Sequence, residues 1–93
     1  MKDIIYEKVI IAIVNQTAQI IGPVAIMQAN NIKGLKVTAA GDISLQGNPV
    51  KKIGLLVKAY DVLIGPVART IAKKGIQKIL EKNPGLKIPK ELK

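Results

Sequence analysis

The feature that most restricts the fold of this chain is a four-residue motif, Gly-Pro-Val-Ala, which occurs at residues 22–25 and again at residues 65–68. Aligned at an offset of 43 residues, the two copies share nine identical residues among the 22 positions from 8 to 29. Two unrelated amphipathic helices would not agree so often. We therefore expect a single domain of 93 residues in which one helical unit is used twice, with a short insert between the copies.

The Gly-Pro pair in each copy allows two interpretations. A proline inside a continuous helix bends it, loses a backbone hydrogen bond and clashes with the preceding turn, at a cost of about 3 kcal/mol. Alternatively, one helix ends at the glycine, which readily adopts a left-handed conformation, and the proline begins a second helix. We favour the break and keep the bend as the alternative. In both cases the motif sets the angle between two helical arms.

The first unit, residues 1–32, has no net charge, and residues 9–32 contain no charged side chain. Residues 4–21 are apolar on almost every side, which is typical of a helix buried on more than one face. Although about 20 apolar residues suffice to span a membrane, the amide side chains and the Gly-Pro pair argue against a span. We expect one side of this helix to be covered by its own domain and the other by a second copy of the chain. The alternative is an ordinary core helix.

The residues that we expect at this interface between copies lie along the uncharged unit. They are Val9, Ile13, Gln16, Ile20 and Met27.

Residues 35–47 alternate between apolar and polar side chains, which predicts a β-hairpin. A three-residue loop at residues 40–42 places all the apolar side chains on one face, whereas a two-residue loop would mix the faces. Such a loop prefers glycine at its last position, where Asp42 stands, so the turn type stays open. The expected cross-strand pairs are Ala39 with Ile43 and Val37 with Leu45.

The second unit, residues 48–82, begins with a clear helix start, because Asn48 is a good N-cap and Pro49 suits the first helical position. Beyond the second Gly-Pro pair, one apolar stripe and one lysine-rich stripe predict an amphipathic helix. Residues 83–93 are expected to form an extended, loosely docked tail.

The net charge of +9 comes entirely from residues 33–93, which contain thirteen basic and four acidic side chains. A solvated helix face would explain the lysines without any function. The functional interpretation is an anionic partner, and a lysine-rich surface contacts phosphates without reading bases. The candidate residues for such a partner are Lys51, Lys52, Lys58, Arg69, Lys73, Lys74, Lys78 and Lys82.

Several classes of chemistry lack the residues that they need. The chain has no cysteine and no histidine, so the commonest metal ligands are missing. Its one serine, Ser44, has no histidine to activate it, and no glycine run has the spacing of a phosphate-binding loop. We therefore expect no enzyme, no cofactor, no bound metal and no small-molecule substrate. The absence of cysteine and of a signal-peptide pattern favours the cytoplasm, although absence of cysteine also fits export.

Together these observations predict a mainly α fold of the α+β class, in which two repeated helical units, bent or broken at Gly-Pro, flank a central β-hairpin. We expect a homodimer. The favoured function is a small, non-catalytic protein–protein interaction or regulatory module, which oligomerises through the uncharged unit and presents a basic helix face to an acidic protein surface. The alternative is a nucleic-acid-binding protein that uses the same lysines without sequence specificity.

Overall fold

The computed structural model describes residues 2–93, with side chains from residue 4 onward. The described residues form four α-helices and one two-stranded antiparallel sheet, so the prediction of a mainly helical chain with a β-hairpin is confirmed. In chain order, the elements are α1 (Lys2–Ile21), α2 (Val24–Asn30), β1 (Leu35–Val37), β2 (Ile43–Leu45), α3 (Pro49–Ile64), α4 (Val67–Lys82) and a 3₁₀ turn, η1 (Lys90–Leu92).

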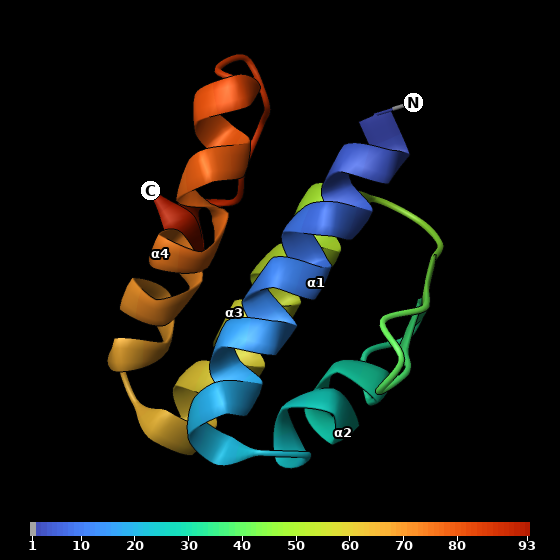
Figure 1. Cartoon of the computed structure of the whole chain (residues 1–93), viewed down its shortest axis with the longest axis vertical. Coiled ribbons are helices and arrows are strands. Elements are labelled where there is room, and N and C mark those ends of the chain that lie inside the picture. The colour runs from blue at the N-terminus through green and yellow to red at the C-terminus, as the bar shows by residue number, and fades with distance from the viewer. Residues whose placement is uncertain (1) are drawn as a thin grey trace.

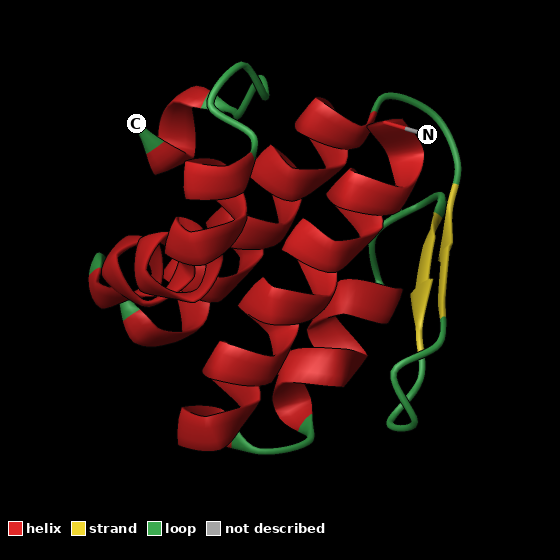
Figure 2. Cartoon of the chain, turned by 45° about the horizontal axis from the view of Figure 1, so that its top comes forward, coloured by secondary structure: helices red, strands yellow, loops and turns green. Residues whose placement is uncertain are grey.

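Helix α1 is the centre of the arrangement. It packs along α4 and also contacts α2 and α3, while α2 contacts α3 and β1 (Figure 1). The first helix of each half of the chain therefore touches the second helix of the other half. The two strands lie at one side of the helices (Figure 2), on the opposite side of the molecule from α4.

Gly22 and Pro23 lie between α1 and α2, and Gly65 and Pro66 lie between α3 and α4. The two glycines have positive φ angles, 71° and 80°. Each glycine N–H donates to the carbonyl four residues earlier at 2.8 Å. The prolines that follow also match, with φ of −59° and −57°. The two Gly-Pro pairs therefore have the same local backbone geometry, and both lie at the lower end of the molecule in Figure 1.

The predicted helix start at Asn48 and Pro49 is confirmed. The Oδ1 atom of Asn48 accepts a hydrogen bond from the Lys51 N–H at 3.2 Å, and Pro49 is the first residue of α3. This side-chain cap satisfies one of the backbone donors that every helix leaves unpaired at its N-terminus.

The predicted hairpin register is wrong by two residues. Val37 pairs with Ile43, and Leu35 pairs with Leu45, whereas Ala39 lies exposed in the loop. Because side chains alternate between the faces with a period of two, a shift of two residues leaves the same side chains on the same face. Both residues of β1 on this face are buried, so the prediction of one apolar face is confirmed.

Turn chemistry explains the shift. The loop contains residues 39–41, with Gly41 in the last position at φ 92°. The carbonyl of Thr38 accepts the Gly41 N–H at 3.0 Å, and the Thr38 hydroxyl oxygen accepts the Asp42 N–H at 3.1 Å. A three-residue loop that placed Asp42 last would force a residue with a Cβ atom into this conformation, so the glycine fixes the loop one residue earlier.

The outer edge of β1 is covered by a side chain from the end of α2. The Asn30 amide donates to the Val37 carbonyl at 2.9 Å, and the Val37 N–H donates to the Asn30 Oδ1 atom at 2.6 Å. One side chain thus takes the place of a neighbouring strand at this position, which satisfies backbone groups that an exposed strand edge would leave unpaired.

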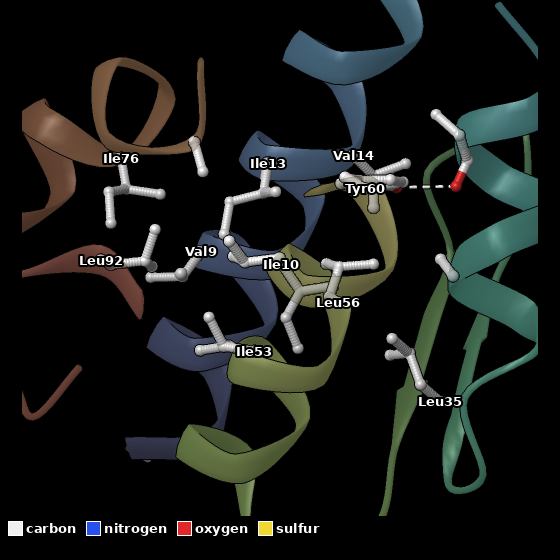
Figure 3. Packing of buried hydrophobic residues seen from close by; sticks show 14 of the residues in the cluster. Val9, Ile10, Ile13, Val14, Leu35, Ile53, Leu56, Tyr60, Ile76 and Leu92 are labelled. Atoms are coloured by element: carbon white, nitrogen blue, oxygen red, sulfur yellow. Dashed lines mark hydrogen bonds between the residues drawn. The ribbon is translucent and has the colours of Figure 1, made fainter. Parts of the chain in front are cut away.

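The buried core is made of aliphatic side chains from every helix and from β1 (Figure 3). Tyr60 supplies a polar contact inside it, because its hydroxyl donates to the Ala25 carbonyl at 2.7 Å and so ties α3 to α2. Burial raises the pKa of Tyr60, since the phenolate would lose its hydration there. Tyr60 therefore acts as a neutral packing residue with one fixed hydrogen bond.

The tail differs from the loose segment that the sequence predicted. Leu92 is only 4% exposed, and it points toward Val9 and Ile76 (Figure 3). The Tyr6 hydroxyl donates to the Lys87 carbonyl at 3.0 Å, which fixes the tail against α1. The prediction of an extended, loosely docked tail is wrong at residues 90–92, because an apolar side chain there completes the core and the backbone forms a 3₁₀ turn.

Residues Ile4–Ile21 of α1 are long and apolar enough to cross a membrane by length and composition alone. In this fold the same segment packs against three other helices, and a third of it is buried within the chain. The core helix of a soluble domain passes the same test of length and composition.

Helices α1 and α4 approach each other closely at Gly75. A Cβ atom built at this position would lie 2.7 Å from the Gln16 Cγ atom and 3.2 Å from the Ala12 carbonyl oxygen. Both distances are shorter than ordinary contacts with a Cβ atom, so the absence of a side chain at Gly75 permits the observed packing.

We predict that Gly75→Ala destabilises the fold by about 1 kcal/mol or more, although alanine favours a helix over glycine by a similar amount. Urea denaturation measures this change. Adding Gln16→Ala should recover part of the loss, because it removes the atom that the new Cβ meets first. Equal or greater stability of Gly75→Ala alone would contradict the close packing of α1 and α4.

Candidate functional site

The most distinct charged feature of the described residues is a row of lysines on α4. The buried residues of α4 are Ala68, Ala72 and Ile76, so the opposite face of this helix points toward solvent. Four lysines are exposed, and none has a carboxylate within 4.0 Å among residues 4–93. We call this set the α4 lysines: Lys73, Lys74, Lys78 and Lys82.

Two other predicted basic residues are already engaged in ion pairs. The Lys58 ammonium lies 3.4 Å from the Glu91 carboxylate, and the Arg69 guanidinium lies 4.0 Å from the Asp61 carboxylate. The second oxygen of Asp61 is buried and has no hydrogen-bond partner among the described residues. The net charge of these two pairs is zero, so they add little to a positive surface.

The structure also separates the two lysines at the start of α3 from the α4 lysines. Lys52 is half-buried, and the end of its side chain lies over Gly34 and Gly47 at the base of the hairpin. Because the hairpin and α4 are on opposite sides of the molecule (Figure 1), Lys52 does not join the α4 surface. Lys51 is exposed and lines a hollow beside the tail.

That hollow has a volume of about 300 Å³ and lies between α3 and the tail. Glu91 closes one side of it, and its carboxylate rests against Gly54, where a Cβ atom would lie 3.0 Å from an oxygen of Glu91. A hydrogen bond from the backbone N–H of Glu91 itself lowers the pKa of that carboxyl, and Lys58 lowers it further, while burial acts in the opposite direction. The ionised carboxylate of Glu91 therefore holds the tail against α3.

Two of the residues predicted for an interface between copies are covered by the chain itself, and a third is half-buried. Val9 and Ile13 are completely buried, and Gln16 packs against Gly75. Val9 and Ile13 therefore cannot contact a second subunit while this fold is intact, and that part of the prediction is wrong. The physical reason is that α4 covers the face of α1 that we expected a second copy of the chain to cover. Ile20 and Met27 are 61% and 63% exposed and stay available.

Sequence reasoning missed several exposed aliphatic residues near the Gly-Pro pairs. Val62 is 87% exposed, and Leu63, Val24 and Val67 are also exposed. A signal was present, because Leu63 and Val67 stand 43 residues after Ile20 and Val24 and are therefore their counterparts in the alignment of the two copies. Of these residues, the helical pattern assigned only Val67 to an apolar stripe, and there it was wrong, because Val67 is 50% exposed.

The described residues give little support for a metal or cofactor site. Within residues 4–93, no three side chains of the metal-binding types come together. The charged groups that lie close to one another are the two ion pairs already described, one at the tail and one beside the second Gly-Pro pair.

Comparison with protein-family models, with curated proteins and with solved structures finds no match for this chain.

We predict that acid weakens the fold partly through Glu91. Its pKa in the folded protein lies below the ordinary value of 4.5. The stability that it contributes is therefore present above about pH 4.5 and disappears as the pH falls through the lower, folded-state pKa. As the pH is lowered from 7 to 3, the free energy of unfolding should fall less steeply for Glu91→Gln than for the wild type.

The matched control for this experiment is Glu81→Gln, which removes an exposed carboxylate on α4 that has no ion pair among the described residues. It should keep the wild-type pH dependence. An identical pH dependence for Glu91→Gln and the wild type would show that the tail contact does not contribute.

Proposed function

We propose that this protein is a small, non-catalytic interaction module, which binds an acidic protein surface through the α4 lysines and assembles as a homodimer. The observation that carries the proposal is the row of four exposed α4 lysines without carboxylate partners among the described side chains. Like charges spaced four residues apart destabilise an isolated helix by a few tenths of a kcal/mol per pair. An acidic partner would turn this repulsion into attraction.

The charge distribution supports the same proposal. The chain carries +9 overall, and all of this excess lies in residues 33–93. Two carboxylates of this segment, Asp61 and Glu91, are paired with Arg69 and Lys58 and leave the α4 lysines uncompensated. A concentrated positive surface accelerates the association with an oppositely charged partner.

An acidic protein fits these residues better than a nucleic acid does. The chain has one arginine, the residue that makes most specific contacts to guanine, and Arg69 is held near Asp61. It has no tryptophan or phenylalanine, and both tyrosines are buried with their hydroxyls donating to backbone carbonyls. No aromatic side chain is thus available to stack on bases. Nucleic-acid binding without sequence preference is the alternative function.

We also propose that the chain arose from two copies of one helical unit that is interrupted at Gly-Pro. The matching backbone angles at the two Gly-Pro pairs support this proposal. So does burial, because at six pairs of equivalent positions the side chain is buried in both copies. These pairs of positions are 10 and 53, 13 and 56, 14 and 57, 17 and 60, 25 and 68, and 29 and 72.

The binding proposal is tested by fluorescence anisotropy with two labelled probes, poly-L-glutamate and duplex DNA, from low salt to about 0.15 M salt. We predict that the wild type binds poly-L-glutamate at low salt. The variant Lys74→Glu/Lys78→Glu should lose at least about tenfold in affinity, since it replaces two positive charges at the contact with negative ones.

The control for the change in total charge is Lys33→Glu/Lys36→Glu, which alters the charge equally but lies next to and within β1. It should retain most of the binding. No binding of poly-L-glutamate at low salt, or equal losses in the two variants, would contradict the proposal. Tight binding of DNA at 0.15 M salt would favour the alternative function.

A further inference from the structure

Two groups of exposed aliphatic side chains surround the Gly-Pro pairs. Every member of the set lies within four residues of Gly22–Pro23 or Gly65–Pro66 and is at least 40% exposed. We call this set the corner patch, and it consists of Ile20, Val24, Met27, Val62, Leu63 and Val67.

The corner patch is concentrated at one end of the molecule. Both Gly-Pro pairs lie at the lower end in Figure 1, so the last turns of α1 and α3 and the starts of α2 and α4 meet the solvent together there. Of the large aliphatic residues that are exposed among residues 4–93, six belong to this end and two, Ile4 and Leu55, lie elsewhere. Contiguous apolar surface on a soluble protein marks an interaction site more often than scattered apolar residues do.

The charge around the patch restricts what can cover it. Residues 9–32 and 62–68 contain no charged side chain, and the nearest charges in sequence, Asp61 and Arg69, form an ion pair with each other. An anionic lipid surface, a nucleic acid or an acidic protein would need cations at the contact, and the segments that carry the patch, residues 20–27 and 62–67, contain none. The occupant must therefore be apolar and uncharged where it touches the patch.

A second copy of this chain meets that requirement. Two molecules that each carry +9 repel one another over most of their surfaces, because the excess charge lies on other parts of the chain. At the uncharged end, this repulsion is weakest and apolar burial is most favourable. A two-fold axis brings the same patch of both molecules together, which is the commonest arrangement in homodimers.

The relation between the two halves of the patch makes it suitable for such an axis. Ile20 and Leu63 are equivalent in the alignment of the two copies, and so are Val24 and Val67. The patch thus presents similar aliphatic side chains twice, once from each Gly-Pro pair. An apolar group that packs against one half of the patch can therefore pack in a similar way against the other half.

We propose that the corner patch is the homodimer interface, in which the Gly-Pro end of one molecule packs against the same end of a second copy. This inference rests on the homodimer in the proposed function and locates it. It replaces Val9 and Ile13 as interface residues and retains Ile20 and Met27.

Sedimentation equilibrium of the full chain tests the proposal. The wild type should show twice its monomer mass of 10.0 kDa. Ile20→Lys and Val62→Lys should each raise the dissociation constant of the dimer about 100-fold or more, because each places an unpaired ammonium in an apolar contact. Val62 is 87% exposed, so its substitution should leave the fold intact, and thermal denaturation checks this point.

The matched control is Ile4→Lys. Ile4 belongs to the same helix and the same residue type as Ile20 and is 57% exposed, close to the 61% of Ile20, but it lies at the opposite end of α1. This variant should remain a dimer. A monomeric wild type at high concentration, or dissociation by Ile4→Lys but not by Ile20→Lys, would overturn the proposal.

The salt dependence separates this inference from the binding function. Added salt should strengthen the dimer, because it screens the repulsion between two +9 molecules, whereas it should weaken binding to poly-L-glutamate. A dimer with no affinity for poly-L-glutamate would refute the acidic-partner function alone. A monomer that binds zwitterionic lipid vesicles, and loses this binding on Ile20→Lys, would instead assign the patch to a membrane surface.

Discussion

Two glycines with positive φ angles determine where the helices of this protein can go. At Gly22 and Gly65, the backbone has a positive φ angle, which costs other L-residues about 1–3 kcal/mol. The proline that follows each glycine has a φ angle near −60°, which suits the start of a helix. The chain thereby changes direction between α1 and α2 and again between α3 and α4. The first helix of each half is left free to pack against the second helix of the other half.

This layout explains why the most apolar segment of the chain is a core element. Helix α1 contacts three helices, and its side chains at positions 9, 10, 13 and 14 are almost completely buried. Burying an aliphatic side chain contributes roughly 1.5–3 kcal/mol, so these positions supply a large share of the stability of a domain this small. Gly75 makes the contact possible, because α4 can lie close to Gln16 only where it carries no side chain. The apolar surface that remains exposed is concentrated at the Gly-Pro end.

The sequence was sufficient to predict those features that depend on local chemistry. The N-cap at Asn48 and the shared apolar face of the hairpin follow from residue types and from a period of two. The hairpin register was predicted wrongly. Gly41 takes the last position of the loop, where φ is positive, so the loop lies at residues 39–41 and not at residues 40–42. The period of two determined which side chains share a face, but not which residues of β1 and β2 stand opposite each other.

Features that depend on what covers a surface could not be predicted from the pattern. Helix α1 is apolar on almost every side, so its sequence does not indicate whether α4 or a second molecule covers Val9 and Ile13. The role of Glu91 and Leu92 was also missed, because a short segment rich in lysine and proline has no periodicity that predicts docking. For the basic surface, the helical pattern identified the exposed α4 lysines correctly but could not place Lys52 beside the hairpin.

The most direct test of this account is the free energy of unfolding of Gly22→Ala and Gly65→Ala, measured by urea denaturation. A Cβ atom at either position would have no neighbour within 4 Å, so any loss reports the backbone conformation and not a clash. We predict that each variant loses about 1–3 kcal/mol. The control Gly85→Ala, where φ is not positive and the space is also open, should stay close to the wild type. Wild-type stability in all three variants would contradict the claim that the two glycines determine the fold.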